Sequence, residues 1–365
     1  MLVFNHTCIG SGHLQSGTPC QDASCSETND HLSIAIVSDG HGGRLHPRSA
    51  MGAQFAVEAA KIVIHENLNG WNYLEKRQFY FTLLWVVWKN MVLKHFQTNP
   101  LTTSERDMLS TYIPALNSVI NQEIIIEDTD IYPLYGCTLL AACIHSNGWF
   151  AFQIGDGRCV IINPNTDQLT EEPIPADDRC FLNKTTSLCD TRADCEFRYY
   201  GGDKESIPNA IFLGTDGIDN SWGNESALHN FYMDILKYCS SRDIVMTELE
   251  ETLPKLSELG SHDDMSIAAI VNQSTLSKTL INIYQFQIEQ CETLIQQQND
   301  LLEKYKQDIQ CLQLKLNEMP EDEFLQRDMD NMQTCLARHQ LINERTICRF
   351  ERLQKEFAFL RLNKK

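Results

Sequence analysis

The chain has 365 residues, a length that suits one large domain or two ordinary ones. Hydrophobic residues make up 42% of it and aromatic residues 9%, which is typical of a protein with a folded core and argues against widespread disorder. The formal net charge of -19 disfavours binding to DNA or to anionic membranes, because both carry negative charge. We therefore expect neither a nucleic acid nor a membrane as a partner.

The fourteen cysteines do not form close CxxC pairs with the spacing of a zinc site. Several, such as Cys137 and Cys143, lie in apolar runs, where a reduced thiol packs as a small hydrophobic group. Residues 1–10 lack the basic start and the long apolar stretch of a signal peptide. The longest apolar stretch, near residues 79–88, is shorter than the roughly 20 residues that span a bilayer. These features predict a cytoplasmic protein with free thiols.

The first predicted elements are a strand and three helices. Residues 31–37 (HLSIAIV) form an apolar run typical of a strand, and a glycine-rich turn follows. Pro47 suits the first turn of a helix, which we expect to extend to His65. Residues 71–97 predict a second helix, rich in aromatic side chains, and residues 104–127 a third.

From residue 137 onward the pattern changes to short apolar runs. Residues 137–144 and 149–154 are predicted strands, and the Asn-Gly pair at 147–148 is typical of the turn of a hairpin. Further strands are predicted at residues 159–162, 210–214 and 265–271. Residues 163–209 are polar and contain several prolines, so we expect a long surface excursion of the kind that is often functional. Strands and helices in this order indicate a layered α+β architecture.

Four aspartates stand at the tips of predicted strands with a glycine next to them or, for Asp263, three positions before. They are Asp39, Asp156, Asp216 and Asp263. One such pair is ordinary turn chemistry, but four of them predict carboxylates that meet where the strands pair side by side. Carboxylates that lie so close together repel one another, and divalent cations would remove the repulsion. Ligand sets made only of oxygen favour Mg²⁺ or Mn²⁺ over zinc.

Short motifs surround these aspartates in a fixed order. They are residues 10–13 (GSGH) with 21–23 (QDA), 38–43 (SDGHGG), 136–138 (GCT), 155–158 (GDGR), 215–217 (TDG) and 260–266 (GSHDDMS). The set resembles the motifs of PP2C-type (PPM) metal-dependent serine/threonine protein phosphatases, in particular their bacterial-like branch. The resemblance covers roughly residues 1–272. It implies two antiparallel sheets packed as a sandwich, with helices outside and metal ions at one edge.

The resemblance also implies metal ligands. Asp39 matches the carboxylate that bridges two metal ions, and Gly40 matches the residue whose carbonyl binds one of them. Asp216 and Asp263 match further ligands of the first ion, and Asp156 matches a ligand of a third, weaker site. The expected cofactors are therefore two Mg²⁺ or Mn²⁺ ions, with a third at the weaker site.

Two further residues match catalytic positions of the family. His41 matches the general acid that protonates the departing alkoxide, and Asp22 matches the acidic residue that orients the attacking water. Two metal ions about 3.5–4 Å apart would ionise this water and neutralise charge on the phosphoryl oxygens, while a protonated imidazole supplies the proton. The expected reaction is the hydrolysis of phosphoserine and phosphothreonine on proteins.

Some positions depart from the family pattern. Gln21 stands where glutamate is frequent, which predicts weaker binding of the second metal ion. Asp264 takes a place often held by asparagine. Asp219 and Asn220 are alternative candidates for a second acidic position that follows Asp216 in the family.

The substrate phosphate has no obvious arginine partner. Gly17 stands where many family members have that arginine, and Arg44, Arg158 and His13 are the candidates to replace it. The departures at Gly17 and Gln21 also motivate an alternative function, a weakly active scaffold or regulatory protein that acts by binding through its C-terminal helices.

A different pattern begins near residue 273. From Ile281 apolar residues recur every seven positions, and a second series lies between them, with Gln298 as a polar exception. The first series is Ile281, Ile288, Ile295, Leu302, Ile309 and Leu316, and the second is Tyr284, Cys291, Tyr305, Leu312 and Met319. This spacing predicts a long helix with a coiled-coil seam.

Residues 318–322 (EMPED) interrupt this pattern and suit the start of a second helix that extends to about Leu360. Its apolar stripe is Leu325, Met329, Met332, Leu336, Phe350, Leu353, Phe357 and Leu360, interrupted by His339, Asn343 and Thr346. We expect an antiparallel helical hairpin over residues 273–365. A bare hairpin leaves apolar edges exposed, which predicts a homo-oligomer or a protein partner. The hairpin lacks the continuous basic stripe of a nucleic-acid binder.

Overall fold

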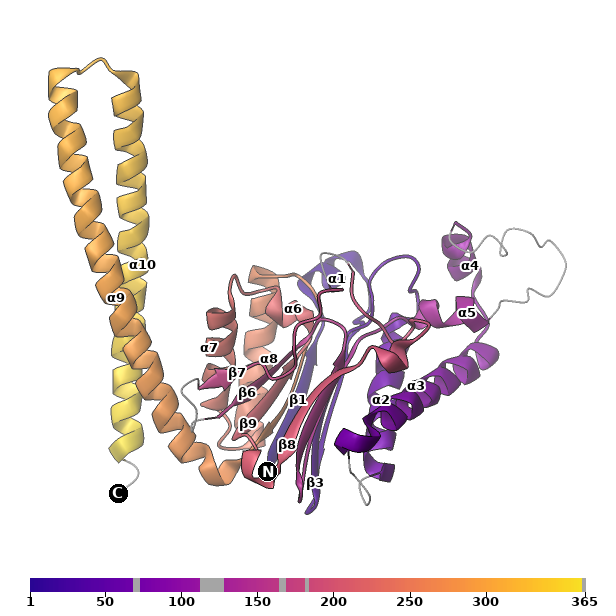
Figure 1. Ribbon diagram of the computed structural model, residues 1–365. Coiled ribbons are helices and arrows are strands. Elements are labelled where there is room, and N and C mark those ends of the chain that lie inside the picture. Colours follow the sequence, from indigo (N-terminus) through magenta and orange to yellow (C-terminus); the bar gives the residue numbers. More distant parts are fainter. Residues whose placement is uncertain (68–72, 112–127, 164–168, 181–183, 363–365) are drawn as a thin grey trace. The chain divides into compact units, whose positions relative to one another are not determined.

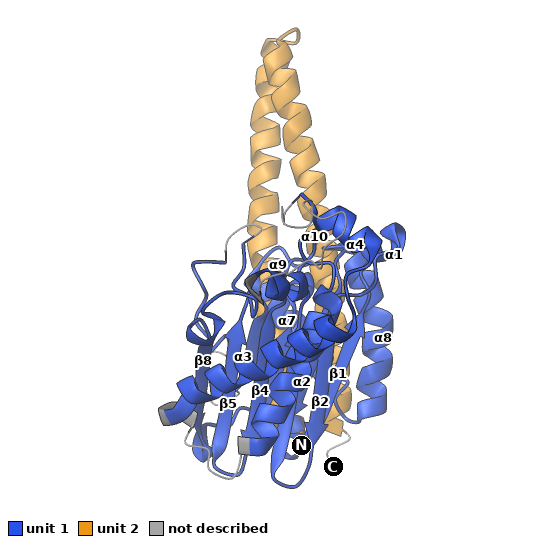
Figure 2. Ribbon diagram, turned by 90° about the vertical axis from the view of Figure 1, so that its right-hand side faces the viewer, with its two compact units in different colours: residues 1–276 blue, residues 277–365 orange. Residues whose placement is uncertain are grey.

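The computed structural model describes residues 1–67, 73–111, 128–163, 169–180 and 184–362. The chain divides into two compact units, Met1–Leu276 and Ser277–Lys365, which Figure 2 shows in blue and orange. The boundary expected from the sequence followed residue 272, where helix α9 (Gln273–Glu318) begins. The first turn of this helix therefore belongs to the first unit.

The first unit is built on two five-stranded sheets (Figure 1). One sheet has the order β1-β10-β9-β6-β7 and the other β2-β3-β4-β5-β8, and all neighbouring strands are antiparallel. The strands are β1 (Leu2–Cys8), β2 (Ala23–Thr28), β3 (Leu32–Ser38), β4 (Leu139–His145), β5 (Gly148–Ile154), β6 (Arg158–Ile162), β7 (Thr170–Glu171), β8 (Arg198–Asp203), β9 (Ala210–Gly214) and β10 (Met265–Val271). The predicted sandwich of two antiparallel sheets is confirmed.

The side chains of β3 show how the layers form. Successive residues of a strand point to opposite faces, so a strand buried on both sides is apolar throughout. Ile34 and Ile36 pack into the cluster that contains the residues of α2 and α3, whereas Ala35 and Val37 pack between the two sheets. All seven residues of β3 are buried as a result.

Helices cover both outer faces of the sandwich (Figure 1). Helix α2 (Ser49–Asn67) packs against β3, and α3 (Tyr73–Thr98) packs against α2. Helix α8 (Arg242–Leu259), next to α7 (Glu225–Leu236), packs against β1. The indole of Trp88 in α3 is fully buried and donates to the carbonyl of Gly52 in α2 over 3.0 Å. The shorter helices are α1 (Ser11–Ser16), α4 (Thr103–Leu109), α5 (Asp128–Ile131), η3 (Tyr132–Tyr135), η4 (Ala193–Cys195), η5 (Lys204–Ser206) and α6 (Asp216–Asp219).

Two expectations differ from the structure. The helix expected over residues 104–127 ends at Leu109, and its part over residues 112–127 lies outside the described residues. The excursion over residues 163–209 contains two strands, β7 and β8, that the sequence did not predict. Strand β8 carries polar residues and two glycines, and it lies at a sheet edge where it pairs only with β5, so its strand state depends on backbone pairing rather than on an apolar pattern.

The second unit consists mainly of α9 and α10 (Glu323–Leu362), which confirms the two predicted helices. Asp322 ends the connection between them, and its carboxylate accepts the backbone N–H groups of Phe324 and Leu325 at 2.9 and 3.1 Å. These donors have no partner within the helix, so Asp322 caps α10. Within the described residues, no helix combines the length and the apolar character needed to cross a bilayer.

The residues that interrupt the apolar stripe of α10 pair across the hairpin. The Nδ1 atom of His339 lies 2.9 Å from Oε1 of Gln298, which is the polar exception in α9. Asn343 donates from Nδ2 to Oδ1 of Asn299 over 2.8 Å. Partly buried polar pairs of this kind favour one alignment of two helices, because a shift would leave them without partners.

Candidate metal centre

The strand order explains why four distant aspartates meet. Asp39 follows β3 and Asp156 follows β5, and the antiparallel strand β4 lies between these two strands. The C-terminal ends of β3 and β5 therefore lie at the same edge. In the other sheet Asp216 follows β9 and Asp263 precedes the antiparallel neighbour β10, so these two residues also share an edge.

The carboxylates converge on one cavity. One oxygen from each of Asp39, Asp156 and Asp216 lies within 4.8 Å of the others. Asp263 lines the same cavity of about 870 Å³, together with Gly40. The structure thus brings all five residues expected as metal ligands to one place.

Asp39 and Asp216 hold their protons more tightly than ordinary carboxyls. Burial raises the pKa of Asp39 well above its usual value, and the charge of Asp22 and then of the neighbouring aspartates raises it further. Burial, followed by the charges of Asp156 and Asp263, raises the pKa of Asp216 to about 7. Divalent cations would compensate these charges, and a donor set made only of oxygen atoms suits Mg²⁺ or Mn²⁺.

Asp22 lies next to this cluster and is itself buried. Burial raises its pKa to about 8, while the hydroxyl of Thr215, which donates to Oδ2 over 2.8 Å, acts in the opposite direction. The other oxygen, Oδ1, is buried and has no hydrogen-bond partner among the described residues. A buried carboxylate oxygen without a donor is costly, so this atom fits a position where a water molecule or a cation completes the site.

The loop that carries Asp39 is held by the 136–138 motif. The backbone N–H of Asp39 donates to the hydroxyl of Thr138 over 3.0 Å, and the N–H of Thr138 donates back to the carbonyl of Asp39 over 2.8 Å. A Cβ atom on Gly40 would lie 2.5 Å from the carbonyl oxygen of Gln21, so only glycine fits there. The 136–138 motif therefore positions the metal ligands without contributing one of the expected set.

Gly155 places Asp156 in a similar way. Its φ of +109° is a backbone conformation that side chains disfavour, and a Cβ atom would lie 2.5 Å from Cβ of Thr138. Its N–H donates to the hydroxyl of Thr186 over 2.9 Å. Thr186 lies in the predicted excursion, so this part of the chain forms one wall of the metal site.

His41 lines the cavity beside a second imidazole. Its ring centroid lies 5.2 Å from that of His46, and its backbone N–H donates to the carbonyl of Gly136 over 3.0 Å. Burial, with a smaller contribution from His46, lowers the pKa of His41 to about 4. The imidazole is therefore neutral near pH 7 in this structure, whereas the sequence suggested a protonated one.

Asp264 anchors the N-terminal motif. Its buried carboxylate accepts the backbone N–H groups of Gly10 and Gln21, each over 2.6 Å. Its Oδ2 also lies 2.9 Å from Nδ1 of His13. The sequence showed Asp264 only as a departure from the family pattern, because its partners are more than 240 positions away along the chain.

The two candidates that follow Asp216 have separate partners. Asn220 lines the cavity, and its side chain donates to Oδ2 of Asp216 over 2.9 Å. Asp219 instead accepts from Nε of Arg158 over 2.9 Å. Arg158 also donates to Glu172 over 3.0 Å, so two carboxylates already neutralise its charge.

Two other positively charged side chains, both from the segment of residues 163–209, line the cavity. Arg179 and Lys184 line the cavity, as does His13, whereas Arg44 is not among the lining residues. Arg179 is paired with Asp177 at 2.8 Å and with Glu196 at 3.3 Å. Lys184 is exposed. The polar composition of residues 163–209 indicated a functional segment but not which of its side chains reach the site.

A helix-flanked antiparallel sandwich that gathers carboxylates at one edge defines a class of protein suited to binding divalent cations. The sequence model of the family described as protein phosphatase 2C matches residues 9–254. This match spans more than half of the chain, which therefore belongs to the protein phosphatase 2C family.

Several solved structures of bacterial proteins are similar to this chain. A bacterial serine phosphatase matches with 14% identity and a TM-score of 0.45, over 75% of this chain and 99% of that one. Serine/threonine phosphatase Stp1 from Staphylococcus aureus matches with 15% identity and a TM-score of 0.44, over 75% and 96%. PppA from Pseudomonas aeruginosa matches with 14% identity and a TM-score of 0.43, over 74% and 96%. A comparison with curated protein sequences finds no significant match.

Proposed function

We propose that this chain is an active phosphatase that hydrolyses phosphoserine and phosphothreonine on proteins, in the cytoplasm, with two divalent cations as cofactors. The observation that carries the proposal is the convergence of Asp39, Asp156 and Asp216, whose carboxylate oxygens lie within 4.8 Å of one another. Membership of the protein phosphatase 2C family supports the same reaction class.

The residues divide into two ligand groups. Asp39, the carbonyl of Gly40, Asp216 and Asp263 would hold the two main cations, and Asp156 would add a ligand for a third. When bound, Mg²⁺ or Mn²⁺ supplies positive charge to the phosphoryl oxygens and makes water acidic enough to attack phosphorus near neutral pH. Arg158 and Arg179 are paired with Asp219 and Asp177, so these two side chains do not neutralise the ligands in place of the metal ions.

His41 and Asp22 would handle protons. The free oxygen of Asp22 accepts a hydrogen bond from the attacking water and so fixes its direction. The imidazole of His41 faces the cavity and is neutral before substrate binds. A phosphate dianion in the cavity favours the imidazolium form, because an opposite charge nearby raises the pKa of a base. His41 would then give its proton to the departing serine or threonine oxygen.

Lys184 is the residue that we assign to the substrate phosphate. Arg158 is excluded from this role by its contacts with Glu172 and Asp219, and Arg44 does not line the cavity. Lys184 is exposed and lines the same cavity as the aspartates, where its positive charge would attract the dianion. His13 also lines the cavity, and its Nδ1 atom lies 2.9 Å from Oδ2 of Asp264.

A second candidate function is a metal-binding scaffold with little activity. The observation that favours it is the side chain of Gln21, which donates from Nε2 to the hydroxyl of Ser49 over 2.8 Å. A neutral amide held in this way is a weaker ligand for a second cation than a carboxylate.

Turnover of p-nitrophenyl phosphate and of a phosphothreonine peptide with Mn²⁺ separates the two functions. We expect Mn²⁺-dependent hydrolysis that falls by roughly a hundredfold or more in Asp39→Asn and in Asp216→Asn. Asp30→Asn, a change of the same type at an exposed position, serves as the matched control. If the wild-type chain binds Mn²⁺ by calorimetry but turns over neither substrate, the scaffold is the correct function.

A further inference from the structure

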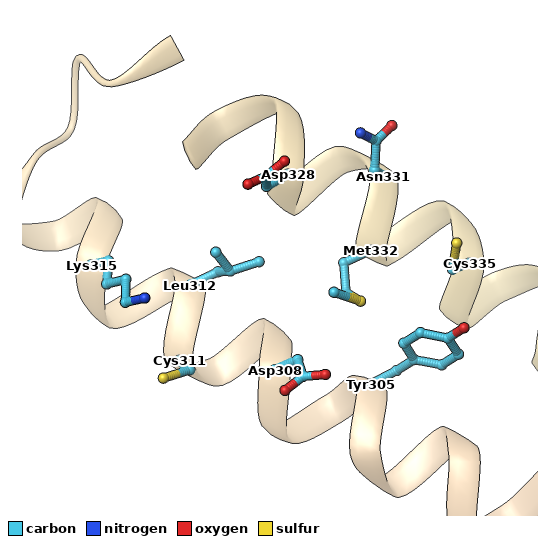
Figure 3. A pocket seen from close by; sticks show the side chains of 9 residues that line it. All are labelled: Tyr305, Asp308, Cys311, Leu312, Lys315, Asp328, Asn331, Met332 and Cys335. Carbon is cyan, nitrogen blue, oxygen red and sulfur yellow. The ribbon is translucent and has the colours of Figure 1, made fainter. Parts of the chain in front are cut away.

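An open groove lies between α9 and α10, near the connection that joins the two helices. It is lined by Tyr305, Asp308 and Leu312 of α9 and by Asp328, Met332 and Cys335 of α10, among others, and has a volume of about 600 Å³. Figure 3 shows Leu312 and Met332 directed into the space between the two helices. Both belong to the apolar seam expected from the sequence, yet both are only partly buried here.

The opposite end of α10 carries apolar residues that the hairpin leaves uncovered. In the last turns of the helix, Phe359 is 67% exposed and Leu362 is 70% exposed. Midway along α10, Leu341 is 47% exposed and Ile342 is 36% exposed. Large apolar side chains in such a series along one helix are typical of an interaction surface.

Charge is distributed unevenly between the two ends. Residues 300–330, around the connection, contain nine acidic and four basic residues. Residues 338–361 of α10 contain six basic and three acidic residues. The connected end of the hairpin is therefore complementary in charge to the C-terminal part of α10. Complementary patches of this kind set the partner and the orientation of an interface.

We propose that the partner of the hairpin is a second copy of this chain, aligned antiparallel to the first. The last turns of α10 from one copy cover the groove of the other, with Phe359 and Leu362 placed over Met332. Arg361 then lies near Asp308 and Asp328 at the rim of the groove. The two-fold symmetry of such a dimer repeats this contact at both ends and yields a four-helix bundle.

The spacing along α10 is consistent with this alignment. Met332 and Phe359 are separated by roughly 40 Å, given about 1.5 Å per residue of helix. In this alignment Met332 of one copy lies against Phe359 of the other copy, and the reverse. The two-fold axis then crosses α10 midway between these residues, close to residues 345 and 346. The exposed residues Leu341 and Ile342 lie about one helical turn from this axis, level with residues 350 and 349 of the second copy, and α10 of that copy would cover them. One alignment thus covers the groove, the exposed end and the exposed middle of α10.

Sedimentation equilibrium of the full chain tests the proposal with charge-reversed variants. The groove variant carries Asp308→Arg and Asp328→Arg, and the end variant carries Arg352→Glu and Arg361→Glu. The wild type should sediment at twice the 41.8 kDa of one chain. Each variant alone should dimerise roughly tenfold more weakly or worse, because like charges then face each other at both contacts. An equimolar mixture of the two variants should dimerise again, since opposite charges meet at both ends.

Two controls separate this interface from general effects of charge. Glu251→Arg with Glu258→Arg makes the same charge change on exposed positions of α8 and should leave the dimer intact. Phe359→Ser should weaken the dimer with no change of charge, and the helix content of each variant should match that of the wild type by circular dichroism. A monomeric wild type, or a groove variant that dimerises as well as the wild type, would overturn the proposal. So would a mixture that stays monomeric while both variants are folded.

Discussion

The carboxylate of Asp264 lies 2.9 Å from Nδ1 of His13, although the two residues are 251 positions apart in the chain. The same carboxylate accepts two backbone N–H groups of the N-terminal segment. One buried aspartate next to strand β10 therefore holds the beginning of the chain against the metal cavity.

Removing this carboxylate should destabilise the first unit. In Asp264→Ala the N–H groups of Gly10 and Gln21 lose their acceptor in a buried place, which costs about 2–4 kcal/mol in the free energy of unfolding. Urea unfolding followed by tryptophan fluorescence measures the change. Asp30→Ala, at an exposed position, should unfold like the wild type. Equal unfolding midpoints for Asp264→Ala and the wild type would show that the anchor contributes nothing.

Lys184→Ala should change substrate binding rather than chemistry. We expect KM for a phosphopeptide to rise roughly tenfold with little change in kcat, because the ammonium group attracts the phosphate equally in the ground state and the transition state. Arg158→Ala is the comparison, since its guanidinium is already paired with Glu172 and Asp219. A larger rise of KM in Arg158→Ala than in Lys184→Ala would assign the phosphate to Arg158 instead.

Gln21→Glu should strengthen cation binding. A carboxylate at this position could accept a hydrogen bond from Ser49 and still offer an anionic oxygen to the cavity, which the amide does not. We expect Mn²⁺ to bind roughly tenfold more tightly by isothermal titration calorimetry. Gln15→Glu adds the same charge at an exposed position of α1 and should leave the affinity unchanged. Unaltered binding in Gln21→Glu would mean that this side chain does not face a cation.

The pair of Glu105 and Arg48 predicts a stability that depends on pH. Nε of Arg48 donates to Glu105 over 2.7 Å, and this contact is the main cause that lowers the pKa of Glu105 from 4.5 to about 2. Because the folded pKa lies below the ordinary one, the stabilisation is fully present above about pH 4.5 and disappears as the pH falls toward 2. The difference in urea midpoint between wild type and Glu105→Gln should therefore be largest near pH 7 and shrink below pH 4. A difference that stays constant from pH 7 to pH 3 would contradict this explanation.

Asn343→Leu should stabilise the hairpin while loosening its alignment. Asn343 is 8% exposed, and its Oδ1 has no hydrogen-bond partner among the described residues. Burying an amide oxygen that accepts no hydrogen bond costs free energy, and an apolar side chain in the seam would remove this cost. We therefore expect a higher melting temperature of the hairpin, measured by circular dichroism. Asn343→Asp, which keeps the size and adds a buried charge, should lower the melting temperature. If leucine also lowers it, the pair of Asn343 and Asn299 contributes net stability.

Much of the fold follows from local patterns in the chain. The buried strands β3, β4, β5, β9 and β10 are nearly continuous apolar runs, and the heptads of α9 and α10 identify a helical hairpin, because a sheet core and a helical seam each need apolar residues at a regular period. Strands β1, β2 and β8 were not predicted. They lie at or beside sheet edges and carry polar residues, so neighbouring strands rather than their own composition hold them in place.

The sequence by itself identified the candidate metal ligands: Asp39, Asp156 and Asp216 stand beside glycine, and Asp263 follows Gly260 by three positions, each at the tip of a predicted strand. Only the tertiary structure decided which other groups surround them. In the folded chain Arg158 pairs with two carboxylates, and Lys184 lines the cavity. Asp264 accepts a hydrogen bond from the N-terminal segment and so anchors it. The physical reason is that turn chemistry acts over a few residues, whereas these contacts depend on sheet order and on how a polar loop packs across the open edge of the sandwich.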